Sequence, residues 1–225
     1  MDNAPNEQFD REYLSLTDWE TLLRAGWDRV GQHFFHRRFD YFEMPFLTET
    51  VITQLELMPL RYKLTGFAFT KSQRAVLKRN ADLTCIYRPT KLTEEKLALF
   101  NKWYFARFGF NSSLFTWVSP ENKPFPTYEV CYYKGDKLIA CSFFDITRTC
   151  QYSTAAMYDP DESHRSLGTL TLLGEIEFGV LHGKKYHFPG HAYVARSVYD
   201  YKKRFNNLQA FNWETKRWRS LQRLK

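Results

Sequence analysis

The segment from Asp159 to Thr169 gathers acidic, basic, hydroxyl and glycine residues directly before an apolar stretch, Leu170 to Leu181. This pattern predicts a strand end, a turn that carries acids, and the glycine-containing start of a helix. Helix N-termini leave backbone N–H groups unpaired and carry the positive end of the helix dipole, so they attract phosphate. Acids beside such a site can hold a cation or a reacting amine. The segment is therefore typical of a transferase that handles a charged donor.

Asp159 and Asp161 are the first candidates for the charged groups of this site. One of them would bind a cationic side chain or an ammonium group, or would accept the proton of an attacking amine. With equal weight, both residues could cap the following helix and complement its dipole. Glu175 and Glu177 lie in the apolar helix that follows, where one of them is a buried, hydrogen-bonded carboxylate or a pocket acid.

The elements that must position this segment predict an α+β fold. Hydrophobic periodicity and capping signals predict helices at 17–26, 70–80, 93–109, 166–182 and 195–203. Extended segments are predicted at 27–36, 61–69, 83–88, 128–133, 137–145, 151–158, 186–189 and 209–213, and 45–57 is strand or helix. A meander followed by strand, turn, helix and strand resembles the acyltransferase fold of GNAT N-acetyltransferases. That fold has a central, mostly antiparallel mixed sheet flanked by helices.

A chain of 225 residues can bury one core together with a small subdomain. We expect residues 1–14 to be a flexible N-terminus and 15–80 to form a small N-terminal subdomain. Residues 81–215 would form the GNAT-like domain, and 216–225 a basic C-terminal tail.

Composition limits the class of protein. An apolar fraction of 44% excludes disorder, and a net charge of +7 is compatible with a polyanionic partner without showing one. The four cysteines, which are scattered, predict buried thiols in a reducing compartment and neither a metal site nor a disulfide framework: Cys85, Cys131, Cys141 and Cys150. No signal region or stretch of membrane-spanning length occurs, so we expect a cytoplasmic protein without membrane contact.

Several segments, taken in order, resemble the arginyl- and leucyl-tRNA–protein transferases. These enzymes move an amino acid from aminoacyl-tRNA to a protein N-terminus. The resemblance spans roughly residues 20–215 and is carried by these segments: Pro59–Arg61, Ser72–Asn80, Asp159–Thr169, Tyr186–Gly190 and Tyr201–Phe205. Together they are far more specific than any single motif.

The resemblance implies an aminoacyl-tRNA as co-substrate, with arginyl-tRNA as the first choice, and no other cofactor. The acceptor would be the N-terminal amine of a protein or peptide. Because the ester is already activated, positioning can supply about 7–11 kcal/mol of barrier lowering. An α-amino group has a pKa of about 7.7–8.0, so a weak proton acceptor or a water relay suffices.

The resemblance also implies roles for individual residues, beyond catalysis by Asp159 or Asp161. The tRNA 3′ end would contact Arg165, Ser166, Gly168 and Thr169, although Gly168 could instead serve close packing. The tRNA backbone would contact basic residues that otherwise form solvated surfaces: Lys71, Arg74, Lys78, Arg79, Lys202, Lys203 and Arg204. The acceptor or aminoacyl pocket would include Gly190, His191 and Tyr201, the last also a candidate for a structural role.

The chain departs from the family pattern at several positions. Family members carry a cysteine cluster before the P-L-R element, whereas Val51, Gln54 and Leu57 stand there in this chain. We expect no metal cluster, because these side chains are not ligands for one. Gln209 replaces an expected glutamate, and His191 stands where tyrosine is common. Two rival functions remain open: an acyl-CoA N-acyltransferase of the same fold, and a non-catalytic module that binds tRNA or peptide.

Overall fold

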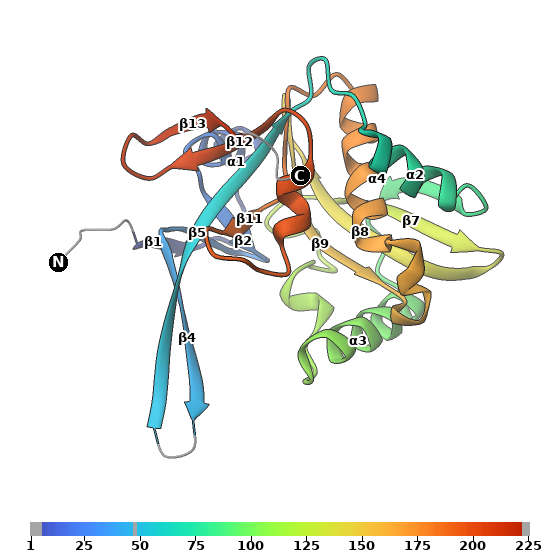
Figure 1. The fold of residues 1–225 in the computed structure, drawn as a ribbon, viewed down its shortest axis with the longest axis horizontal. Coiled ribbons are helices and arrows are strands. Elements are labelled where there is room, and N and C mark those ends of the chain that lie inside the picture. The colour runs from blue at the N-terminus through green and yellow to red at the C-terminus, as the bar shows by residue number, and fades with distance from the viewer. Residues whose placement is uncertain (1–5, 47–48, 222–225) are drawn as a thin grey trace.

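The computed structural model describes residues 6–46 and 49–221 and is a mixed α+β structure (Figure 1). A small antiparallel sheet near the N-terminus has the strand order β1-β3-β2. Its strands are β1 (Asn6–Asp10), β2 (Asp28–Val30) and β3 (His33–Arg37), and α1 (Leu16–Arg24) follows β1. The prediction of a flexible N-terminus is wrong for residues 6–10, because β1 pairs with β3 along its whole length.

A large sheet forms the body of the molecule. Eight of its strands follow the order β13-β12-β5-β10-β9-β8-β7-β6, and β4 and β11 also pair with β5. Every pairing in it is antiparallel except that of β9 with β10. The strands are β4 (Phe39–Phe46), β5 (Glu49–Lys63), β6 (Thr84–Pro89), β7 (Tyr128–Lys134), β8 (Lys137–Ile146), β9 (Cys150–Tyr158), β10 (Tyr186–Phe188), β11 (His191–Tyr193), β12 (Leu208–Asn212) and β13 (Arg217–Ser220).

Helices cover both faces of this sheet (Figure 1). On one face α4 (Leu167–Leu181) packs on β8 and β9, with α2 (Lys71–Arg79) beside it. On the other face α3 (Glu94–Phe108) packs on the same two strands. Successive residues of a strand point to opposite faces, so Val130 joins the α4 core and Cys131 the α3 core. The described part of the chain also has three 3₁₀ helices: η1 (Leu114–Thr116), η2 (Pro160–Arg165) and η3 (Asp200–Arg204).

Local sequence signals locate the ends of two helices correctly. Thr70 caps α2 with both bonds of the capping box, and Gly183 after α4 has the left-handed conformation that often follows a helix, φ 64°. The predicted helix at 17–26 is α1, which begins at Leu16 because Ser15 is its N-cap. The predicted helix at 195–203 is wrong; only η3 forms there.

The predicted single strand at 27–36 is instead two strands, β2 and β3. Gly31 lies between them with φ 57°, and a Cβ there would lie 2.4 Å from the Thr116 carbonyl oxygen. Only glycine fits such a turn. The turn brings the end of β2 toward the large sheet, where Arg29 pairs with the buried Asp145 at 2.6 Å.

The expected boundary near residue 80 does not separate two compact units. β5 lies inside the large sheet, between β12 and β10, and α2 packs against α4. Trp19 of α1 also donates a hydrogen bond to Asp145 of β8 at 3.0 Å. The N-terminal elements therefore share a core with the rest of the chain and form one wall of the site described below.

The parallel pair β9 and β10 separates at its carboxyl end. Their pairing covers Cys150–Tyr152 and Tyr186–Phe188, after which β10 ends while β9 continues to Tyr158. The next strand, β11, pairs with β5 and not with β9. The strands β9 and β10 thus separate near the start of α4, and this opening holds the candidate site.

Candidate active site

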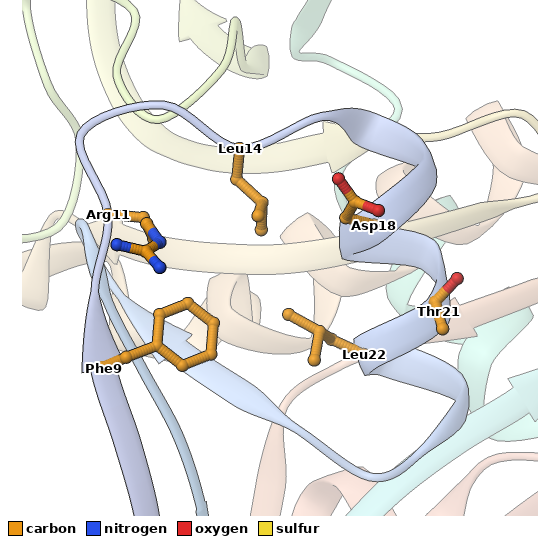
Figure 2. A pocket seen from close by; sticks show the side chains of 6 residues that line it. All are labelled: Phe9, Arg11, Leu14, Asp18, Thr21 and Leu22. Carbon is orange, nitrogen blue, oxygen red and sulfur yellow. The ribbon is translucent and has the colours of Figure 1, made fainter.

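A cavity of about 670 Å³ lies at this opening. Residues of β9, of the first turns of α4, of the C-terminal half of α3, of β2 and β3, and of the segment from Pro189 to Lys202 line it. A second hollow, of about 310 Å³, lies between β1 and α1 (Figure 2). Its lining is Phe9, Arg11, Leu14, Asp18, Thr21 and Leu22, with no described residue in common with the larger cavity.

Glu175 extends from α4 to the inner end of the larger cavity. Its side chain is buried, and burial raises the pKa of its carboxyl group to about 8 against the hydrogen bond from Ser153. The Ser153 hydroxyl donates to Glu175 Oε2, and His187 Nε2 lies 3.5 Å from the same oxygen. Glu175 therefore has neutral hydrogen-bonding neighbours and no ion pair to a lysine or arginine among the residues described.

His187 is neutral and oriented by its neighbours. Burial, followed by the charge of Lys202, lowers its pKa to about 3. The Gln151 side-chain amide donates to the Glu175 carbonyl and to His187 Nδ1, the latter at 2.9 Å. With Nδ1 accepting, Nε2 carries the proton and donates to Ser153 Oγ at 3.1 Å. Histidine, serine and glutamate thus form one directed hydrogen-bond chain that ends at the cavity.

Asp28 and Lys202 carry opposite charges on the cavity wall. Asp28 Oδ2 lies 2.5 Å from His191 Nδ1, and the Tyr152 hydroxyl donates to Asp28 Oδ1. Lys202 donates to the carbonyl oxygens of Pro189 and His191 at 2.7 and 3.1 Å. Burial lowers the pKa of the Lys202 ammonium to about 8, while the Asp28 charge opposes this. The site therefore holds a cation with carbonyl partners close to a carboxylate.

The predicted turn before α4 does face the cavity. Ser166, Gly168 and Thr169 line it, and Ser166 caps the helix with φ 58° and no side-chain capping bond. Arg79 of α2 holds this turn by donating to Ser166 Oγ at 3.2 Å and to the His164 carbonyl at 2.9 Å. The helix N-terminus is thus directed at the cavity by a basic residue from another element.

Gly168 also serves packing, as the alternative interpretation held. A Cβ at this position would lie 3.2 Å from Tyr158 Cε1, which is tighter than ordinary contact. Gly190, His191 and Tyr201, which were predicted for the acceptor or aminoacyl pocket, also line the cavity. Gly190 has φ 76°, a conformation that favours glycine.

The prediction that Asp159 and Asp161 are catalytic is not supported by their positions, since neither lines the cavity. Asp159 is buried and pairs with Lys102 at 2.5 Å and Lys137 at 2.7 Å. Burial raises the pKa of Asp159, but the bonds from the two lysines outweigh it and lower the pKa to about 2. Asp159 also caps η2 through Asp161 N, so the capping interpretation describes it better.

Two further predicted tRNA contacts are engaged within the protein. Arg165 pairs with Asp82 and Glu162, with closest distances of 2.9 and 2.7 Å. Lys203 is buried and donates to the Tyr193 carbonyl. Neither side chain is placed to contact an RNA backbone.

The remaining basic residues of these predictions have different surroundings. Lys202 belongs to the cavity wall. Exposed side chains, which suit a surface contact, are those of Lys71, Arg74, Lys78, Arg79 and Arg204.

Sequence reasoning missed Ser153, His187 and Asp28, and it left the role of Glu175 open. A carboxylate within an otherwise apolar helix was the one available signal for Glu175. Asp28 comes from the small N-terminal sheet, far from the other residues in the sequence. Nothing in its local pattern distinguishes it from a surface acid.

A buried group that could offer metal ligands lies outside the cavity. Ligand atoms of Glu129, Cys131 and Cys141 lie within 4.8 Å of one another. The Glu129 carboxylate is already bound by Lys96 at 2.6 Å and Arg88 at 2.7 Å. Two cations beside the carboxylate make this group a poor metal site.

In the part of the chain that is described, no helix is long and apolar enough to cross a membrane.

Comparison with protein families gives a direct match over the segment that builds most of the cavity. Residues 82–212 match the family described as "Arginine-tRNA-protein transferase, C terminus". This range is more than half of the chain. The chain belongs to this family. The family segment includes Glu175, Lys202 and the α4 turn, whereas Asp28 lies before it.

Curated relatives carry a related name. The chain is 27% identical over 164 residues to an aspartate/glutamate leucyltransferase of Campylobacter jejuni, covering 69% of this chain and 64% of that protein. It is 24% identical over 193 residues to the protein of the same name from Helicobacter hepaticus, covering 82% and 75%. The chain thus spans slightly less than two thirds of the Campylobacter relative.

A solved structure shares the fold. The C-terminal domain (DUF2156) of a candidate lysylphosphatidylglycerol synthetase from Agrobacterium fabrum superposes with a TM-score of 0.50 at 14% identity. The match covers 74% of this chain and 52% of that chain. At this identity the likeness concerns the fold alone.

Proposed function

We propose that the chain is an aminoacyltransferase that moves an amino acid from aminoacyl-tRNA to the N-terminal amine of a protein or peptide. The observation that carries this proposal is the buried Glu175 carboxyl group, facing the opening between β9 and β10 with a raised pKa. Family membership supports the reaction class. The parting of two parallel strands beside the start of a helix supports a GNAT-type arrangement, in which the donor enters the opening.

Glu175 is the proposed proton acceptor. The acceptor's α-ammonium group must first lose a proton, so that the neutral amine can attack the carbonyl carbon of the ester. As the C–N bond forms and the ester bond breaks, a second proton of the nitrogen passes to the departing ribose oxygen of the tRNA. A carboxyl group with a pKa of about 8 matches an α-amino group, whose pKa is about 7.7–8.0, so transfer between them is nearly balanced. The His187–Ser153 chain fixes the orientation of this carboxyl group.

Lys202 and the α4 turn are proposed to hold the donor. The Lys202 ammonium would stabilise the negative charge that develops on the ester oxygen, since a cation in a site shielded from water acts strongly there. Ser166, Gly168 and Thr169 would bind the terminal ribose and phosphate through the helix N-terminus. The exposed α2 residues Lys71, Arg74 and Lys78 would contact the RNA backbone outside the cavity.

Leucine is the proposed amino acid, in place of the arginine expected from the sequence. Relatives named for leucyl transfer support it. Besides Arg107, the cavity wall from α3 and the end of η1 is aromatic, with Phe100, Trp103, Tyr104, Phe108 and Trp117. A guanidinium group would need a carboxylate partner. The three cavity carboxylates already have partners within the protein: Asp28, Asp40 and Glu175.

The acceptor is proposed to begin with aspartate or glutamate, as the name of the relatives indicates for those proteins. The test is to incubate the chain with radiolabelled leucyl-tRNA or arginyl-tRNA and peptides that differ only in the first residue. We expect label from leucyl-tRNA on the α-amine of peptides that begin with Asp or Glu, located by mass spectrometry. Absence of transfer from both charged tRNAs, together with turnover of an acyl-coenzyme A, would instead support the rival acyltransferase.

A further inference from the structure

Arg107 is one of the cations that line the cavity. Arg29, Arg37, Arg107 and Lys202 are the lysines and arginines that line the cavity. Arg29 and Arg37 each pair with a carboxylate, and Lys202 donates to two carbonyl oxygens. Within the described ranges, Arg107 has neither a hydrogen bond nor an ion pair. A guanidinium with five donors is therefore free to bind an anion in the cavity.

The surroundings of Arg107 favour a bound ligand. It lies in the last turn of α3, half-buried, with its Cζ atom 5.9 Å from the ring centre of Trp103 and 5.7 Å from that of Phe108. Aromatic rings beside a guanidinium keep water from it while leaving its N–H edge free. Such a group binds a planar carboxylate through two parallel hydrogen bonds.

The neighbours of Arg107 indicate whether it would bind a carboxylate of the acceptor or a phosphate of the tRNA. Burial is the main cause of the lowered Lys202 pKa, and the Arg107 charge adds to it. The same charge acts on Tyr199 and Tyr201. These three residues belong to the lining segment from Pro189 to Lys202, which also carries Gly190 and His191, whereas Arg79 holds the turn before α4. Arg107 therefore lies near the segment that was predicted to form the acceptor pocket.

We propose that Arg107 binds the side-chain carboxylate of the first residue of the acceptor, and so selects proteins that begin with aspartate or glutamate. This inference rests on the proposed function and assigns its acceptor preference to one residue. An amide in place of the carboxylate keeps the shape but loses the charge. Charge-assisted hydrogen bonds are worth roughly twice a neutral one, so the preference should be large.

The experiment compares kcat/KM for two peptides that differ only in beginning with Glu or Gln. The variants are Arg107→Leu, Arg107→Lys and, as a matched control, Arg148→Leu in the exposed β8–β9 turn outside the cavity. We expect the wild type and R148L to prefer the Glu peptide, and R107L to reduce that preference roughly 10- to 100-fold, mainly through KM. R107K should retain part of it, because it keeps the charge without the planar fork.

Three results would overturn the assignment. An unchanged Glu-to-Gln ratio in R107L would show that Arg107 does not contact the acceptor side chain. An equal loss for both peptides, with a raised KM for aminoacyl-tRNA, would place Arg107 on the donor. A wild type that transfers to neither peptide would overturn the proposed function itself, and this inference with it. Should R107L not fold, as judged by thermal unfolding, the same ratio measured on R107K decides.

Discussion

Asp159 and Glu175 are equally buried, at 1% exposure each, and yet their pKa values are shifted in opposite directions. Two lysines bind Asp159, whose pKa is lowered to about 2. Glu175 meets only serine and histidine, and burial raises its pKa to about 8. The difference shows that burial alone does not make a carboxylate reactive. A group that keeps its proton near neutral pH, and faces a cavity, can exchange it with a substrate.

The largest expected effect is on catalysis by Glu175. Glu175→Gln keeps the size of the side chain but removes the proton acceptor, so kcat should fall about 10²- to 10³-fold. Glu177→Gln is the matched control, because Glu177 lies two residues further along α4 and is exposed. Single-turnover transfer from charged tRNA measures both. Equal rates for E175Q and wild type would remove Glu175 from the mechanism.

Glu175 also predicts a pH dependence of stability. Its pKa is raised in the folded state, so the folded protein holds one proton more than the unfolded chain between about pH 4.5 and pH 8. The free energy of unfolding should therefore fall as the pH rises through this window, by at most about 1.4 kcal/mol per pH unit. Urea unfolding of wild type and E175Q at pH 5 and pH 8 tests this. The difference between the two proteins should shift in favour of E175Q at pH 8.

For Asp159 we expect the opposite dependence, in which the free energy of unfolding rises with pH. Asp159→Asn should cost about 1–2 kcal/mol of stability near pH 7, since it removes a buried carboxylate whose lysine partners are partly exposed. A lowered folded pKa contributes stability above the unfolded value of 3.8, and that contribution is lost as the pH falls toward 2. The wild-type advantage should shrink over this range in urea unfolding. Transfer per folded molecule should stay unchanged, and loss of turnover in folded D159N would restore Asp159 as a catalytic candidate.

Much of the fold could be predicted because its signals are local. Thr70 and Gln73 form the capping box of α2 within one turn, and the β7–β8 hairpin is set by a short turn around Gly135. β1 could not be predicted, because only pairing with β3 makes residues 6–10 a strand. The same holds for the N-terminal boundary, which is lost because β5 pairs with β12 and β10 inside the large sheet.

The site was predictable in part for the same reason. Gly190, His191 and the α4 turn lie in continuous motifs, and all of them line the cavity. The partners of Asp159 come from α3 and β8, so no motif around Asp159 shows that its charge is neutralised. Asp28 enters from the N-terminal sheet. Charge state depends on contacts between distant elements, and these are absent from any local pattern.

Arg61 is a buried cation without a charged partner, and changing its surroundings gives the smallest expected effect on stability. Its guanidinium lies between the rings of Tyr186 and Trp218, with Cζ 4.1 and 4.5 Å from their centres. Its Nε donates to Gln209 Oε1 at 2.7 Å, and in the described chain it has no carboxylate partner. Burial lowers the Arg61 pKa to about 10. The amide at position 209 therefore leaves this charge unneutralised.

Gln209→Glu should give the buried Arg61 charge an oppositely charged partner, as the lysines do for Asp159. The new carboxylate would meet a cation that is already desolvated, so the variant should gain about 0.5–1 kcal/mol in urea unfolding at pH 7. The gain should vanish when the pH falls below the pKa of the new glutamate. Asn212→Asp, a charge change of the same kind on β12, is the control, because Asn212 bonds Thr215 and has no contact with Arg61. Equal stability of Q209E and wild type would mean that the aromatic rings already compensate the buried guanidinium.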